Sequence, residues 1–208
     1  LVKDNDLFLI CDEVYREFCY DGEHISVLNL KGIEDNTILI DSFSKRYSEC
    51  GIRIGALISR NKDIISTALK FAQARLSPPS LGQIVAEASL NVDKAYLNEC
   101  FHEYKNRRDF IISELNKIKG VYAPLPRGAF YTMVHLPVDD AEKFSIWLLE
   151  NFQFEGSTVM LAPGNGFYTG QKIGKQQVRL AYVLNIEQLK KAVKCLKHAL
   201  EEYPGRII

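Results

Sequence analysis

Two unbroken apolar runs, each followed by polar residues, constrain the fold of this chain more than any other feature. They lie at residues 7–11 (Leu-Phe-Leu-Ile-Cys) and 37–42 (Thr-Ile-Leu-Ile-Asp-Ser). A strand with one solvated face alternates apolar and polar residues, whereas a continuous apolar run is typical of a strand buried on both faces of a parallel sheet. We therefore expect an α/β fold with a mainly parallel sheet.

Strands of this kind need neighbouring strands and covering helices, and only a few such strands follow in the sequence. The chain also opens at Leu1 rather than at a methionine. We therefore expect that an N-terminal part of the protein is absent from this chain.

Hydrophobic periodicity and capping residues predict the remaining elements. The expected strands are 53–59, about 121–123, 129–136, 158–161 and 177–183. The expected helices are about 62–75, one from Ser80, about 93–119, about 140–152 and 186–203, with Asn61, Asp93 and Asn185 as N-caps of the first, third and last. These patterns predict an α/β part at residues 1–98 and a smaller α+β domain at residues 99–208, linked by the helix 93–119.

Composition excludes several classes of function. The chain has 26 Lys and Arg and 26 Asp and Glu, so bulk charge favours neither nucleic acid nor an anionic membrane as a partner. It contains no apolar run long enough to span a membrane, and its first residues lack the pattern of a signal peptide, so we expect neither a membrane span nor a secreted protein. The five cysteines lack Cys-x-x-Cys spacing, which favours free, mostly buried thiols in a reducing cytoplasm. The four histidines have no metal-ligand spacing, so we expect no metal site.

Polar side chains follow the two apolar runs, where open α/β sheets place their ligands. Asp12 and Tyr15 follow the first run, Ser42 and Lys45 follow the second, and Arg53 begins the next expected strand. Each alone has a more common explanation, such as a helix cap, a packing residue, a solvated amine or an ion pair. Together they can form a nucleophilic amine beside an anion site, since neighbouring cations and desolvation lower a lysine pKa and arginine binds anions through paired hydrogen bonds.

The order and spacing of these residues resemble a known family. Asp12-x-x-Tyr15 is followed by Ser-x-Ser-Lys45 and then by Gly-x-Arg53-x-Gly. The match continues in three downstream segments, Pro-Arg-Gly-Ala-Phe-Tyr at 126–131, Ala-Pro-Gly-Asn-Gly-Phe at 162–167 and Val-Arg-Leu-Ala-Tyr at 178–182. Over essentially its whole length the chain resembles the fold-type I aminotransferases of class I/II, and the aspartate aminotransferase-like members in particular.

The resemblance implies a cofactor, pyridoxal 5′-phosphate (PLP), and a role for each residue. Lys45 would bind PLP as a Schiff base and move the substrate proton. Asp12 would keep the pyridine nitrogen protonated, which makes the ring an electron sink. Tyr15 would hydrogen-bond the ring oxygen O3′, and Ser42 and Arg53 would hold the phosphate.

The resemblance also implies a substrate contact and a domain arrangement. Arg179 would bind the substrate α-carboxylate, whereas Ser44 matches the motif without an implied contact. Residues 1–98 would be the C-terminal part of the PLP-binding large domain, and residues 99–208 the small C-terminal domain.

Other parts of the family's active site fall upstream of this chain. These are a glycine-containing phosphate turn, an aromatic residue that stacks on the pyridine ring and an Asn-Pro segment. Members of the family place their active sites at a homodimer interface, so we expect a homodimer of the full-length protein. We expect this chain alone to bind PLP weakly or not at all and to be inactive.

The resemblance to aspartate aminotransferases implies aspartate and 2-oxoglutarate as substrates, with a ping-pong mechanism. Arg75 is a candidate for the cation that a second substrate carboxylate needs. Aromatic and branched amino acids remain open. Two other functions also fit: a PLP-dependent β-lyase or decarboxylase on the same fold, and an aminotransferase-like sensor domain of a transcription regulator.

Overall fold

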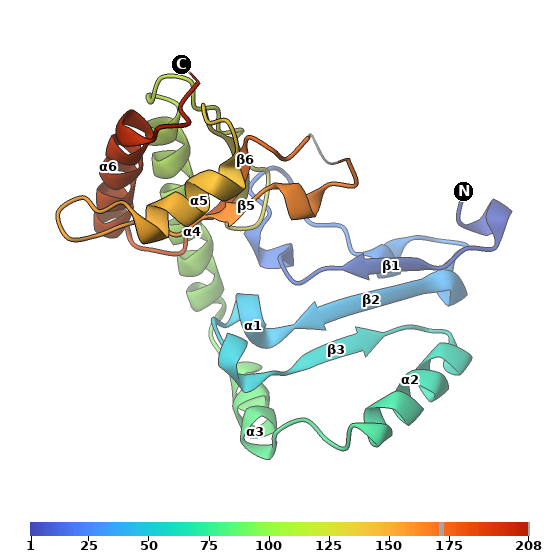
Figure 1. Ribbon diagram of the computed structural model, residues 1–208. Coiled ribbons are helices and arrows are strands. Elements are labelled where there is room, and N and C mark those ends of the chain that lie inside the picture. The colour runs from blue at the N-terminus through green and yellow to red at the C-terminus, as the bar shows by residue number, and fades with distance from the viewer. Residues whose placement is uncertain (171–172, 208) are drawn as a thin grey trace. The chain divides into compact units, whose positions relative to one another are not determined.

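A three-stranded sheet organises the first of the two units into which the chain divides, Leu1–Phe101 and His102–Ile208. The computed structural model describes residues 1–170 and 173–207. The strands of the first unit, in their order across the sheet, are β1 (Leu9–Asp12), β2 (Thr37–Ser42) and β3 (Gly55–Ile58) (Figure 1). β1 and β2 are parallel, as predicted, whereas β3 runs antiparallel to β2. The carboxyl ends of β1 and β2 and the start of β3 therefore lie at the same end of the sheet.

Three α-helices lie wholly within the described part of the first unit. A single α-helical turn, α1 (Phe43–Arg46), follows β2 directly, and α2 (Lys62–Ala74) and α3 (Ser80–Ser89) follow β3. Asn61 caps α2 as predicted, because its side-chain oxygen accepts hydrogen bonds from the N–H groups of Asp63 at 3.0 Å and Ile64 at 3.1 Å.

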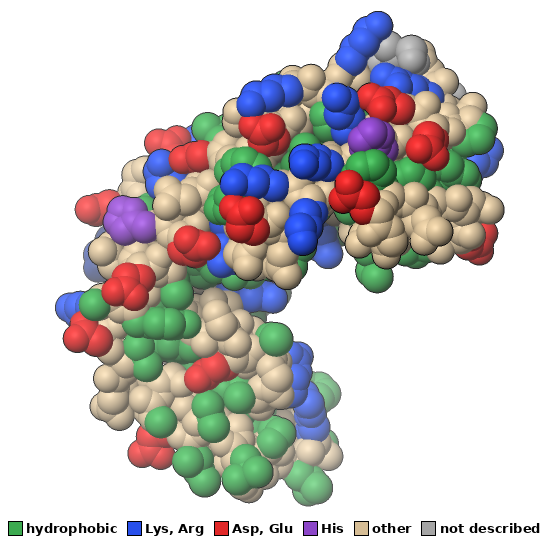
Figure 2. Space-filling view, turned by 90° about the vertical axis from the view of Figure 1, so that its left-hand side faces the viewer, with side chains coloured by type: hydrophobic (Ala, Val, Ile, Leu, Met, Phe, Trp, Pro, Cys, Tyr) green, Lys and Arg blue, Asp and Glu red, His purple; other side chains and the backbone are tan. Residues whose placement is uncertain are grey.

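The prediction that the first apolar run is buried on both faces is wrong for the described chain. Ile10 of β1 is 66 % exposed, and every residue of β3 is exposed. β1 and β3 are the two outer strands of the described sheet, and an apolar run becomes buried only where another layer covers it. Further large apolar side chains of this unit are exposed as well, and Figure 2 shows hydrophobic side chains at the surface in the region of α3. They include Phe8, Leu69, Phe71, Leu76, Leu81, Ile84 and Leu90.

The second unit packs helices against an antiparallel sheet. Its strands, in the order β4-β6-β5, are β4 (Tyr131–His135), β6 (Gln177–Ala181) and β5 (Ala162–Pro163). Its helices are the C-terminal part of α4 (Lys94–Leu115), α5 (Ala141–Glu150) and α6 (Ile186–Glu202). All three helices and the sheet supply one buried core, which includes Leu115, Val134, Phe144, Leu148, Val178, Tyr182, Leu196 and Leu200.

Several expected elements are shorter than predicted or do not form. α4 ends at Leu115 rather than near residue 119, because Asn116 exchanges side-chain hydrogen bonds with the backbone of Ala123 at 2.8 and 2.9 Å and so ties the helix end to the next segment. The expected strand at 121–123 is reduced to one bridge between Tyr122 and His135. No strand forms at 158–161, and the pairing begins at Ala162 instead.

Candidate functional site

The end of the first sheet brings most of the predicted cofactor residues together. The register aligns Asp12 with Ile40 in the parallel pair and Ser42 with Gly55 in the antiparallel pair. Lys45 lies in α1, which leaves β2 at this end, and Arg53 lies two residues before β3 begins. The topology therefore gathers a carboxylate, an amine, a hydroxyl and a guanidinium at one end of the sheet.

Asp12 is the last residue of β1, and Tyr15 lies in the turn that follows. The carboxylate of Asp12 is exposed and accepts a hydrogen bond from the N–H of Val14 at 3.1 Å, which fixes the start of the turn. Tyr15 is half-buried, and its ring contacts the buried Phe18 edge-on with centroids 6.5 Å apart. The turn thus presents an accessible carboxylate beside an anchored phenol.

Ser42 and Ser44 form a hydroxyl pair between β2 and α1. The Ser42 hydroxyl caps α1 by accepting from the N–H of Ser44 at 3.0 Å, and it lies 2.8 Å from the Ser44 hydroxyl and 3.2 Å from the carbonyl oxygen of Ile54. The contact with Ile54 places the Ser42 hydroxyl at the residue that precedes β3, and the sequence did not indicate the direct contact of the two hydroxyls.

Arg53 has a backbone conformation that is uncommon for a residue with a side chain. Its φ is +59°, in the left-handed region. The exposed guanidinium donates a hydrogen bond to the carbonyl oxygen of Cys50 at 2.8 Å. Non-glycine residues in this region cost about 1–3 kcal/mol of strain and cluster at ligand-binding sites.

Glycine 82 of α3 allows the helix to approach the turn that carries Arg53. A Cβ atom at Gly82 would lie 2.5 Å from the carbonyl oxygen of Ile52, closer than any side chain can pack. On the same side, the hydroxyl of Ser89 lies 2.8 and 3.0 Å from the two carboxylate oxygens of Glu49. α3 therefore supports the turn between Lys45 and Arg53.

Sequence reasoning missed a buried carboxylate next to Asp12. Glu13 is 3 % exposed and contacts three groups of the segment 24–27: the N–H of Val27 at 2.7 Å, His24 Nε2 at 2.8 Å and the Ser26 hydroxyl at 3.1 Å. Burial opposes ionisation of Glu13, but the hydrogen bonds outweigh burial and hold its pKa below the usual value. The sequence did contain a signal for Glu13, namely an acid placed directly after an apolar strand.

Sequence reasoning also missed four mutually paired charged side chains, which we name the charge cluster: Arg16, Glu17, Asp41 and Arg46. The sequence did contain a signal for Asp41. Successive side chains of a strand point to opposite faces, so Asp41 lies on the face of β2 opposite Ser42. Sequence alone could not show which cations Asp41 meets.

Arg179 lies in the second unit, in β6, between two aromatic rings. Its guanidinium carbon is 5.5 Å from the ring centroid of Tyr131 and 5.0 Å from that of Phe167. Arg179 is exposed, so its donors are accessible from solvent. Both aromatic residues belong to the quoted motif segments, but the sequence did not show that they flank Arg179.

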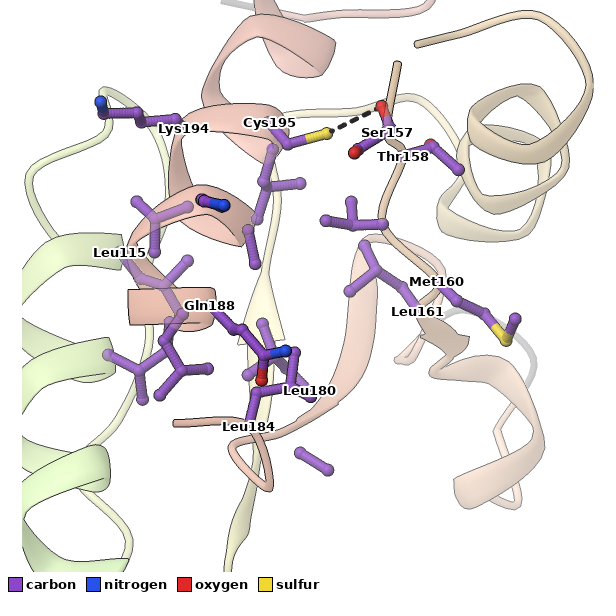
Figure 3. A pocket seen from close by; sticks show the side chains of 18 of the residues that line it. Leu115, Ser157, Thr158, Met160, Leu161, Leu180, Leu184, Gln188, Lys194 and Cys195 are labelled. Carbon is purple, nitrogen blue, oxygen red and sulfur yellow. Dashed lines mark hydrogen bonds between the residues drawn. The ribbon is translucent and has the colours of Figure 1, made fainter. Parts of the chain in front are cut away.

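The second unit also contains an apolar cavity of about 810 Å³ (Figure 3). Figure 3 shows Leu180, Leu184 and Gln188 on one side of the cavity and Leu161 on the other. The thiol of Cys195 contacts the carbonyl oxygen of Ser157 at 3.6 Å. All residues that line this cavity belong to the second unit, so none of the predicted cofactor residues lies in it.

The remaining site predictions concern Arg75, cysteines and metals. Arg75 is exposed at the C-terminal end of α2. All five cysteines are free, as expected, but only Cys195 is fully buried.

Among residues 1–170 and 173–207 no group of three or more His, Cys, Asp or Glu could hold a metal ion. Within the same residues, no helix has the length and apolar content required to cross a membrane.

Comparison with known proteins identifies relatives over nearly the whole chain. The model of the family "Aminotransferase class I and II" matches residues 1–196. An aspartate aminotransferase from Thermotoga maritima is 34 % identical over 93 % of this chain and 47 % of its own length. One from Pyrococcus horikoshii is 29 % identical over 97 % of this chain and 50 % of its own length.

Solved structures agree with the sequence relatives. The crystal structure of an aromatic aminotransferase from Pyrococcus horikoshii matches with a TM-score of 0.82 and 30 % identity, over 97 % of this chain and 53 % of that protein. The chain thus spans about half the length of the relatives that it matches.

Proposed function

The chain belongs to the class I and II aminotransferases, and from that premise we propose that it supplies one half of an enzyme that transfers an amino group between an amino acid and a 2-oxo acid. The observation that carries the proposal is the convergence of Asp12, Ser42, Lys45 and the Arg53 turn at one end of the first sheet. Three segments of the chain, the end of β1, the junction of β2 and α1, and the turn before β3, meet there with the functional groups that this chemistry needs.

The residues at this end of the sheet fit pyridoxal phosphate. Arg53 and the paired hydroxyls of Ser42 and Ser44 suit a phosphate, and Lys45 suits an aldehyde. The exposed carboxylate of Asp12 suits a protonated ring nitrogen. When bound, pyridoxal phosphate supplies an electron-accepting ring.

Each residue then has a defined task. Lys45 would link the cofactor covalently, and its amine, once freed by the substrate amine, would take the proton from the substrate Cα and carry it to the cofactor carbon on the other side of the imine nitrogen. Asp12 holds a proton on the ring nitrogen, and Tyr15 donates a hydrogen bond to the ring oxygen. Ser42 and Arg53 anchor the phosphate, which orients the cofactor toward the amine.

Arg179 is proposed to bind the α-carboxylate of both substrates. A guanidinium forms two parallel hydrogen bonds with a carboxylate, and the contacts with Tyr131 and Phe167 restrict the plane in which it can lie. The amino donor and the oxo acceptor share this carboxylate, so one arginine serves both halves of a ping-pong reaction.

We propose aspartate and 2-oxoglutarate as the substrates, supported by the aspartate aminotransferases among the relatives. The matching aromatic aminotransferase structure makes aromatic amino acids the main competitor. Arg75 is the candidate for the second carboxylate of a dicarboxylic substrate. We further propose that the full-length protein is a cytoplasmic homodimer and that this chain alone has negligible activity.

The test uses the full-length protein with Lys45→Ala and, as matched control, Lys70→Ala on the exposed face of α2. The protein is incubated with pyridoxal phosphate and reduced with borohydride, and the covalent adduct is located by peptide mass spectrometry. We expect one adduct at Lys45 in the unmodified protein and in the control, and none in Lys45→Ala.

The proteins that form the adduct at Lys45 should also form an oxo acid from aspartate, and Lys45→Ala should not. An unmodified protein without an adduct at Lys45 would refute the cofactor assignment. Release of ammonia or carbon dioxide instead of stoichiometric exchange of amino and oxo groups would favour a lyase or decarboxylase.

A further inference from the structure

The charge cluster connects the two segments that carry the proposed cofactor contacts. Arg46 Nη2 lies 3.0 and 2.8 Å from the two carboxylate oxygens of Asp41, and Arg46 Nε lies 2.7 Å from Glu17. Arg16 approaches the same two acids, at 3.0 Å from Glu17 and 3.3 Å from Asp41. One guanidinium thus bridges the end of β2 to the turn that follows β1.

Three members of the cluster are chain neighbours of proposed cofactor residues. Arg46 follows Lys45 in α1, Asp41 precedes Ser42 in β2, and Arg16 follows Tyr15. A displacement of the cluster therefore moves the amine, the hydroxyl and the phenol together, although no member of the cluster is itself proposed to touch the cofactor.

The cluster is sufficiently buried to hold its geometry. The side chains of Arg46 and Asp41 are 10 % and 12 % exposed, and that of Glu17 is 20 % exposed. Burial opposes the charge on Arg46, but its contacts with Asp41 and Glu17 outweigh burial and raise its pKa. Loss of one partner from a buried pair leaves an uncompensated charge, which costs far more than loss of a surface pair.

The chemistry of the cluster requires an arginine at position 46. A guanidinium spreads its charge over three nitrogens in a fixed plane. Here Nη2 donates hydrogen bonds to Asp41, and Nε forms an ion pair with Glu17 on another segment, without hydrogen-bond geometry. A lysine amine is a point charge on a flexible stem and cannot span both acids with the same orientation.

We propose that Arg46 is a positioning residue that fixes the amine of Lys45 by joining α1 to Asp41 and Glu17. The inference rests on the proposed function, because it assigns Lys45 as the group that links the cofactor. It predicts that substitution of Arg46 slows the reaction of the Lys45 amine and leaves the phosphate anchor of Ser42 and Arg53 in place.

The experiment measures covalent capture of pyridoxal phosphate at Lys45 in the full-length protein with Arg46→Met and Arg46→Lys. Borohydride is added at increasing times, and the adduct at Lys45 is quantified by mass spectrometry. We expect Arg46→Met to slow capture about 10- to 100-fold, the effect of a small misplacement of a reacting group. Arg46→Lys should restore capture only in part.

Two controls separate positioning from general loss of structure. Arg108→Met removes another buried arginine, which lies in the second unit and binds Asp109 and the carbonyl oxygen of Pro126. We expect it to lower the melting temperature without slowing capture. Equilibrium dialysis in the Lys45→Ala background then measures non-covalent binding, which we expect to be unchanged by Arg46→Met.

The outcomes are distinct. Absence of an adduct in the unmodified protein would refute the proposed function and this inference with it. Equal capture rates in the unmodified protein and Arg46→Met would overturn the positioning role alone. Loss of non-covalent binding in the double variant would also overturn it, because Arg46 would then support the whole site rather than the amine.

Discussion

The buried carboxylate of Glu13 offers a sharp test of the structure next to Asp12. The change Glu13→Gln keeps the shape of the side chain and removes its charge. One side-chain oxygen can still accept from the N–H of Val27 and the hydroxyl of Ser26, which lie 2.7 and 3.1 Å from Oε1. The amide nitrogen replaces Oε2, which lies 2.8 Å from Nε2 of His24.

The expected cost is about 1.5–3 kcal/mol, the contribution of one hydrogen bond to a charged group. Glu13 is 3 % exposed, so solvent screening does not reduce this value. If the Val27 amide exchanges through local opening, the same free energy corresponds to exchange that is about 10- to 100-fold faster in the variant.

The pH dependence follows from the lowered pKa of Glu13. A carboxyl group whose pKa is lower in the folded state contributes stability above its unfolded pKa of about 4.3, and this contribution is lost as the pH falls through the folded pKa. The difference in free energy of unfolding between the unmodified protein and Glu13→Gln should therefore be largest at pH 6–7 and shrink below about pH 4. It should vanish at a pH at which Glu13 is protonated in both the folded and the unfolded state.

Hydrogen exchange of the Val27 amide and urea unfolding of the full-length protein measure the difference. The matched control is Glu23→Gln, the same chemical change at an exposed acid in the same segment. The reasoning would be falsified if Glu13→Gln cost no more than the control, or if its cost were equal at pH 7 and pH 3.

Three further predictions concern close packing, a hydrogen bond and the core. Gly82→Ala should displace the turn at Ile52, whose carbonyl oxygen lies 2.5 Å from the new Cβ, and weaken phosphate-dependent binding measured by dialysis with pyridoxal phosphate. Tyr203→Phe should destabilise the second unit by about 1.5–3 kcal/mol in urea, because the hydroxyl donates to Asp139 at 3.0 Å. Burial and Asp139 raise the pKa of Tyr203 to about 12, so this contribution should persist below pH 10 and disappear as the pH rises through about 12. Leu200→Ala should cost about 2–5 kcal/mol of unfolding free energy, because Leu200 is fully buried. Equal stability of either second-unit variant and the unmodified protein would contradict the described core.

Features that depend on neighbouring residues could be predicted from the sequence. Asn185 caps α6 as expected, because its side-chain oxygen accepts from the N–H of Gln188 only three residues away. The parallel pairing of β1 and β2 followed from two continuous apolar runs, and the motif around Lys45 identified the family without any tertiary contact. The cap, each apolar run and the motif around Lys45 are signals within one or two helical turns or along one strand, and the strand pairing was inferred from two such runs.

Features that depend on distant partners were decided only by the tertiary structure. The sequence could not show that Arg46 meets Glu17, that Glu13 holds the segment around Val27, or that Phe167 flanks Arg179. It also could not show that Ile10 is exposed, because burial of an apolar strand depends on which layers cover it. The sequence by itself thus determined which chemical groups are present and on which elements they lie. Tertiary packing decided how these groups are oriented and paired, because the contacts that orient them join residues far apart in the chain.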